Sequence, residues 1–180
     1  VGYSALENQN MGAATANYNV GVGYKAGEAV TTGVQNTLIG GLAGDALTDA
    51  DLNVAVGMQA LTADTLGSRS TAMGFFALGS QNFTTATNTY NTAVGYSAGG
   101  ANTTGETNTF LGATAGAANT SGNNNSAMGY AALFTNILSD RNVAVGNNAL
   151  YSHNQTTSVD SYNVAVGYSA GTAVTTATEN

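Results

Sequence analysis

The chain has 180 residues, of which only 7% are charged, and its net charge is −7. Its three basic residues, Lys25, Arg69 and Arg141, are too few for a basic patch, so nucleic acid is not expected as a partner. No apolar run is long enough to insert into a membrane, and the absence of cysteine excludes disulfides and thiol chemistry.

Glycines recur along the chain at regular spacings. They are Gly2, Gly23, Gly40, Gly57, Gly74, Gly95, Gly112, Gly129, Gly146 and Gly167, called here the repeat glycines. Most are separated by a 17-residue unit and three pairs by a 21-residue unit, so one long and three short units form a 72-residue module. This periodicity predicts a single repeat array over 1–180, with modules at 23–94 and 95–166 and partial modules at 1–22 and 167–180. Both ends fall within a repeat, so we expect a window cut from a longer fibre protein.

Each repeat glycine follows a short segment of the form N-x-A-V-G, which is rich in β-branched residues and too short for a helix. We predict an all-β fold, a β-solenoid (β-roll) of about ten stacked coils of 17 or 21 residues, roughly 48 Å long. The aliphatic residue before each glycine, such as Val94, is expected to form an internal ladder. An Ala three residues after every glycine, such as Ala98 or Ala115, indicates a site closed to larger side chains.

The polar remainder of each unit predicts further structure. Thr pairs at 31–32, 103–104 and 175–176 offer a second short strand, and the chain contains no proline to interrupt a ladder. The 72-residue period is visible in Arg69 and Arg141, and in Tyr18, Tyr90 and Tyr162. The residue after the repeated Ala is Leu or Gly in an order that also recurs every four units.

An Asn stands four residues before most repeat glycines, with Ser70 the exception. These residues are Asn19, Asn36, Asn53, Asn91, Asn108, Asn125, Asn142 and Asn163. We interpret them as a structural ladder at a solenoid corner, in which each amide bonds the next copy. The alternative is a row that binds a ligand.

The residue two before each repeat glycine is apolar in every copy, from Gly21 and Leu38 to Ala165. Strand alternation turns it away from the aliphatic ladder, so an exposed apolar stripe is predicted. We expect this stripe to mediate association of the chain with itself, most simply as a homotrimer. The competing interpretation buries both strand faces within one chain.

Aromatic residues directly follow several repeat glycines. Tyr24, Tyr96, Tyr130 and Tyr168 are candidate residues for binding a cell-surface glycan or receptor, because aromatic rows stack on sugar rings. The other interpretation is that they stack on each other. Thr at most positions eight after the glycine also raises ice binding as a third function.

The sequence contains no arrangement typical of an enzyme, a cofactor site or a metal centre. The only histidine, His153, is interpreted as a solvated loop residue. Asp45, Asp49 and Asp51 are considered as cation ligands, but their spacing fits no known loop, and no metal or cofactor is expected.

The strings NTAVGYSAG, NTFLGATAG and NVAVGYSAG resemble repeats of phage tail-fibre shafts and large bacterial surface proteins. The motif also resembles the head repeats of trimeric autotransporter adhesins, although the 17- and 21-residue periods are longer. The resemblance implies a left-handed β-roll built from three chains and an extracellular location, on a cell surface or a virion. We therefore expect a non-enzymatic shaft or adhesin segment, with a glycan-binding surface or an ice-binding solenoid as alternatives.

Overall fold

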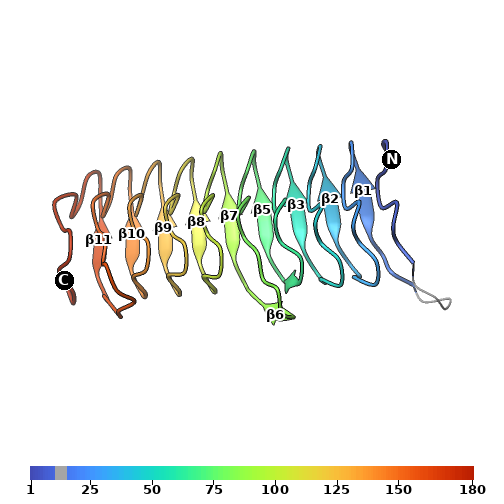
Figure 1. Ribbon diagram of the computed structural model, residues 1–180. Coiled ribbons are helices and arrows are strands. Elements are labelled where there is room, and N and C mark those ends of the chain that lie inside the picture. The colour runs from blue at the N-terminus through green and yellow to red at the C-terminus, as the bar shows by residue number, and fades with distance from the viewer. Residues whose placement is uncertain (11–15) are drawn as a thin grey trace.

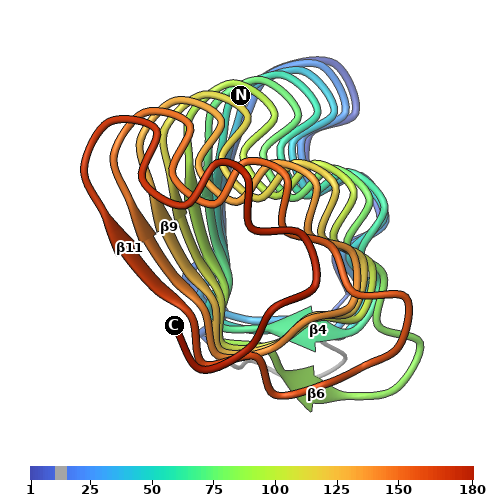
Figure 2. The ribbon, with the colours of Figure 1, turned by 90° about the vertical axis from the view of Figure 1, so that its left-hand side faces the viewer.

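The computed structural model describes residues 1–10 and 16–180, and within them the chain is all-β, with no helix. The chain winds into a parallel β-solenoid of about nine turns, which Figure 1 shows from the side. Viewed along the axis, in Figure 2, successive turns superimpose as a flat wall of strands, a finger-like turn and a lower edge with bulges. The predicted stacked-coil architecture is therefore confirmed.

One strand per turn builds the wall. The nine-stranded sheet contains β1 (Val20–Val22), β2 (Thr37–Ile39), β3 (Val54–Val56), β5 (Thr71–Met73), β7 (Thr92–Val94), β8 (Thr109–Leu111), β9 (Ser126–Met128), β10 (Val143–Val145) and β11 (Val164–Val166). All neighbours are parallel and in register, so that Ala55 lies opposite Ala72, and Ala72 opposite Ala93. The register is the same across the 17- and 21-residue units, so the extra residues lie outside this sheet.

A second sheet forms at one place only within the described residues, where β4 (Gly67–Ser68) pairs with β6 (Thr87–Asn88) at the bulge of a long unit. The Thr pairs at 31–32, 103–104 and 175–176 lie in bends, so the second strand predicted there is wrong. Thr31 and Thr103 do bond the next turn through backbone N–H groups, to Thr48 and Thr120. The ladder of hydrogen bonds therefore continues through these bends without a strand.

The two faces of the main sheet are the reverse of the prediction. The middle residue of every strand is buried, from Leu38 and Ala55 to Phe110 and Ala144, whereas the flanking aliphatic residues face solvent. The predicted alternation is confirmed, but the internal ladder consists of the middle strand residues and not of the aliphatic residues before the glycines. The interior behind the strands is too narrow for a continuous column of Val, Ile and Met, and Ala fits there instead.

A second inward column explains the order of Leu and Gly. Beside Ala72 and Ala144, the residue four after the repeat glycine is Leu78 or Leu150, and all four are buried. Beside Phe110 that position is glycine on two successive turns, because a Cβ at Gly99 would lie 2.6 Å from Phe110 Cδ2 and one at Gly116 would also overlap the ring. The order of Leu and Gly that recurs every 72 residues therefore compensates for the size of the buried strand residues, so that the core is filled to a similar volume on each turn.

The repeat glycines bring successive turns into close contact. Gly95 has φ +137°, and a Cβ there would lie 2.6 Å from the carbonyl carbon of Gly112 on the next turn. Both the backbone conformation and the space therefore require glycine. The Ala three residues later, such as Ala98 or Ala115, is completely buried, as the tight interior requires.

Candidate interaction surfaces

The broadest uniform surface is the outward side of the main sheet, called here the outer face. It consists of the residues one and three before each repeat glycine, from Val20 and Val22 in β1 to Val164 and Val166 in β11. Ile39, Met73 and Leu111 are 38%, 41% and 45% exposed. Every residue of the outer face is Val, Ile, Leu, Met, Thr or Ser, and none is charged. The column one before each repeat glycine is apolar throughout, and a continuous apolar stripe is typical of an association surface.

The aromatic residues after the repeat glycines form a second exposed row. Tyr3 stacks on Tyr24, with ring centroids 5.7 Å apart, and Phe75 stacks on Tyr96 at 5.5 Å. Tyr130 and Tyr168, which are 58% and 79% exposed, have no ring contact within the described residues. Two of the four candidate binding residues, Tyr24 and Tyr96, are therefore already stacked on a neighbour, and two present free ring faces.

The corner Asn residues make a repeated pair of hydrogen bonds between turns. Asn108 is completely buried; its Oδ1 accepts from the backbone N–H of Asn125 at 2.9 Å, and its Nδ2 donates to the Gly122 carbonyl at 2.8 Å. One or both bonds recur at each of the others, namely Asn19, Asn36, Asn53, Asn91, Asn125, Asn142 and Asn163. Most of these Asn side chains bond backbone groups and are buried, so they are inaccessible to a ligand.

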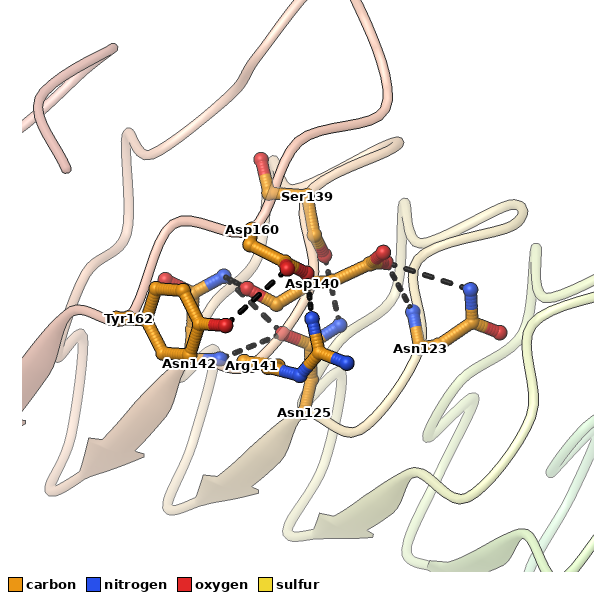
Figure 3. A network of polar contacts seen from close by, with 8 residues as sticks. All are labelled: Asn123, Asn125, Ser139, Asp140, Arg141, Asn142, Asp160 and Tyr162. Atoms are coloured by element: carbon orange, nitrogen blue, oxygen red, sulfur yellow. Dashed lines mark hydrogen bonds and ion pairs between the residues drawn. The ribbon is translucent and has the colours of Figure 1, made fainter.

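The two arginines, Arg69 and Arg141, each contact a tyrosine in the bulge of a long unit. In Figure 3, Arg141 forms an ion pair with Asp160, and its guanidinium lies 5.6 Å from the ring centroid of Tyr162. Tyr162 in turn donates its hydroxyl to Asp160 Oδ2 at 3.1 Å. In the preceding module Arg69 lies over Tyr90 at 5.9 Å. The Arg–Tyr spacing found in the sequence therefore corresponds to a contact that links a short unit to the following long one.

The acidic residues are part of the same framework. Asp140 Oδ1 accepts from the backbone N–H of Asn123 at 2.6 Å, as Figure 3 shows, and Asp51 accepts in the same way from Val34. Asp45 accepts from the Thr62 hydroxyl at 2.6 Å, and Asp49 accepts from the Thr32 hydroxyl. Within residues 1–10 and 16–180 no group of three or more His, Cys, Asp or Glu side chains is placed to hold a metal ion.

His153 is not the solvated loop residue that the sequence suggested. Its side chain is completely buried, because it lies seven residues after Gly146, at a position whose counterparts Leu47 and Gln81 also point inward. Burial lowers the pKa of His153, with a smaller opposing effect from the Thr175 backbone. Its polar neighbours in sequence, such as Asn154, concealed this periodicity; the apolar or amide residues at the same place in other units were the signal that would have found it.

The Thr residues eight after the repeat glycines are bonded to the next turn. Thr31, Thr48, Thr103 and Thr120 each donate the side-chain hydroxyl to a carbonyl of the next turn, at 3.0–3.3 Å. Asn82, Ile137 and Asn154 interrupt the row. The resulting surface lacks the regular array of hydroxyls that the ice-binding alternative needs.

Comparisons with known proteins add no relative from which a function can be carried over. No protein-family model, no curated protein and no solved structure matches the chain. Among the described residues there is no helix with the length and apolar character of a membrane span. The outer face is consequently the feature on which a functional argument rests.

Proposed function

We propose that this chain is a structural, non-enzymatic segment of an extracellular fibre, on a cell surface or a virion, and that it associates with copies of itself through the outer face. The observation that carries the proposal is a largely apolar face without a single charge over nine strands of a chain whose net charge is −7. The charged side chains lie outside this face, so copies can meet here without burying an ionic group.

The size of the outer face bears on how strongly copies would associate. Nine strands spaced by about 4.8 Å, and a width of about three residues at about 3.3 Å each, give roughly 430 Å² per chain. Two such faces bury about 860 Å², less than a standard specific interface. We therefore expect weak association that depends on protein concentration, with three chains as the form that the resemblance to adhesin repeats implies.

The in-register ladder makes parallel association favourable. Each turn repeats the same backbone at the same rise, so aligning two copies by one turn aligns them by all turns. Met73, Leu111 and Met128 offer flexible or large side chains between the smaller Val residues, and can fill gaps in such an interface. The assembled rod would act as a stiff spacer, with the bulge of a long unit projecting from it once per 72-residue module.

Leu111→Lys tests the proposal, because it places a charge near the middle of the outer face at a half-exposed residue outside the core. Thr104→Lys is the matched control: it adds the same charge at an exposed residue away from the main sheet. We expect the wild type and Thr104→Lys to associate, and Leu111→Lys to remain monomeric at the same concentration. Equal masses for all three proteins would overturn the proposal.

A glycan-binding surface is a second candidate, favoured by the free ring faces of Tyr130 and Tyr168. Exposed tyrosines without a stacking partner are suited to lie against the apolar side of a sugar ring. Saturation-transfer NMR with neutral hexoses, comparing wild type with Tyr130→Ala, tests it. A transfer signal that the substitution removes supports glycan contact; no signal in the wild type would reject it.

A further inference from the structure

The solenoid has a buried column that is polar over much of its length. It is formed by the residues seven after each repeat glycine and is called here the inner column. Its members include Val30, Leu47, Asp64, Gln81, Asn102, Asn119, Asn136 and His153, all completely buried. Because polar groups buried without partners are costly, the hydrogen bonds of this column decide the stability of each turn.

In the first module, the polar atoms of Gln81 in the inner column all have hydrogen-bond partners. Its Nε2 donates to Asp64 Oδ2 at 2.6 Å and to Ser70 Oγ at 2.8 Å. Its Oε1 accepts from Asn91 Nδ2 at 2.9 Å. This one side chain thus joins its own turn to the preceding one. The buried Asp64 carboxylate also accepts from the backbone N–H groups of Gly67 and Phe83.

In the second module His153 occupies the place of Gln81, and Asn136 stands in place of Asp64. Asn136 donates to Asn119 Oδ1 at 3.0 Å, but its own Oδ1 has no partner. Neither ring nitrogen of His153 has a partner at good hydrogen-bond distance and angle, and only the Thr175 backbone makes a weak polar contact with the ring. The buried Ser139 and Ser161 hydroxyls of the same two turns have no partner either. The same place in the fold is therefore saturated in one module and unsaturated in the next.

No charge compensates His153. Its neighbours along the column are Asn136 on the preceding turn and Val174 on the following one, and the backbone of Thr175 lies beside it. Asp140, Asp160 and Arg141 belong to the outer corner, where Arg141 and Asp160 pair at the surface. The one buried carboxylate among the described residues, Asp64, belongs to the other module. An imidazolium at this place would have no counter-ion.

We propose that His153 is an acid-sensitive point of the rod: protonation of this buried side chain opens the turn that contains it, while the corresponding turn of the first module stays closed. The inference is independent of what the fibre contacts. It means that mild acid would loosen one of the long units, and with it the bulge at 154–160, before the rest of the array responds.

The direction of the effect follows from proton linkage. Burial holds the pKa of His153 below its ordinary value of 6.5, so the open turn binds a proton more readily than the closed one. Closure is therefore fully stable above about pH 6.5 and weakens as the pH falls towards the lowered pKa. The limit is about a tenfold increase in the opening constant per pH unit.

Hydrogen exchange provides the measurement, because the array contains its own control. The amides of Leu150 and Asn154 donate to Ala170 and Thr175, as those of Leu78 and Asn82 donate to Ala98 and Thr103. We would measure protection factors of both sets at pH 7 and pH 5, corrected for intrinsic exchange. The ratio of second-module to first-module protection should fall several-fold or more at pH 5. An unchanged ratio would overturn the proposal.

Two variants separate protonation of His153 from general acid fraying. His153→Gln installs the residue that the first module carries at this place, and Asn136→Asp supplies the carboxylate that Asp64 supplies there. Neither variant should show the fall at pH 5: in the first nothing titrates, and in the second the imidazolium gains a partner, so that closure is at least as strong at pH 5 as at pH 7. A wild-type fall that persists in His153→Gln would show that another group is responsible. Persistence in Asn136→Asp would contradict the role of the missing counter-ion.

Discussion

Phe110 occupies the space that a side chain at Gly99 would need: a Cβ at that glycine would lie 2.6 Å from Phe110 Cδ2. The same exchange of volume holds at Leu38, whose Cδ1 would lie 2.5 Å from a Cβ at Gly27. Where a strand and the next one both contribute Ala, as Ala55 and Ala72 do, the turn after the first of them carries Leu, here Leu61, at the position of these glycines. Two positions per turn therefore share one core volume.

We predict that Phe110→Ala lowers the free energy of unfolding by about 3–5 kcal/mol, because it leaves a cavity in a close-packed interior. The double variant Phe110→Ala, Gly116→Leu should recover about 1.5–3 kcal/mol, the contribution of one buried Leu. Leu is compatible with the backbone there, since Leu78 has φ 48° and Gly116 has φ 58°. Denaturant unfolding followed by circular dichroism measures both. If the second substitution only adds to the damage, volume exchange is not the rule.

A substitution at Ala98 tests whether the interior has room for a larger side chain on the other side of the turn. Ala98→Leu should lower stability by about 1–3 kcal/mol through overpacking, since Ala98 is completely buried. Ala113→Leu is the control, because it lies in the row that already accepts Met58 and Tyr96, and it should change stability by less than about 0.5 kcal/mol. Thermal melts of the two variants give the comparison. Equal melting temperatures would refute the tight site.

Replacing a buried Asn of the ladder should lower the free energy of unfolding, whereas replacing an exposed Asn should not. Asn108→Ala removes two bonds, of 2.8 and 2.9 Å, and leaves the backbone N–H of Asn125 without its acceptor. We expect a cost of about 1–3 kcal/mol. Asn147→Ala, at an exposed position, is the matched change and should be nearly neutral. Denaturant midpoints for both decide the point, and a neutral Asn108→Ala would mean that the backbone finds another partner.

The sequence predicted the features of this structure that follow from residue spacing, but not those that depend on contacts between turns. The repeat glycines and the apolar strand residues established the stacked coil, because their spacing reflects the length of one turn. They did not establish which face is inside, since Val94 and Ala93 are both apolar and only the width of the interior distinguishes them. His153 was misplaced for a related reason: its burial is set by Asn136 and Val174 on the adjacent turns, not by the polar residues beside it in sequence.

The candidate surfaces were likewise predicted from the sequence only in part. That Tyr24 stacks on Tyr3 was foreseen as one of two interpretations, because adjacent turns bring equal positions together. The Arg–Tyr contacts were visible only as a shared 72-residue period, and their geometry required the path of the bulge. The association surface was expected on the Ala stripe, which is buried, and the exposed apolar surface lies on the opposite side of the same strands.

The Arg141 contact should contribute little and depend on salt. Arg141 and Asp160 have side chains 44% and 42% exposed, so Arg141→Ala should lower stability by at most about 1 kcal/mol. Adding about 0.5 M NaCl should reduce this difference, because salt screens exposed ion pairs. Arg69→Ala, which removes a 2.9 Å hydrogen bond to Asn88 and no ion pair among the described residues, should be less sensitive to salt. Unfolding at two salt concentrations checks this, and equal salt dependence would argue against the ion pair.

The central claim, association through the outer face, is tested most directly by the mass of the chain in solution. Multi-angle light scattering would be recorded for the wild type, Leu111→Lys and Thr104→Lys over a series of protein concentrations. The account predicts that the wild type and Thr104→Lys rise from one chain of 17.9 kDa towards three as the concentration increases, and that Leu111→Lys stays at one. A wild-type mass of one chain at every concentration would contradict it.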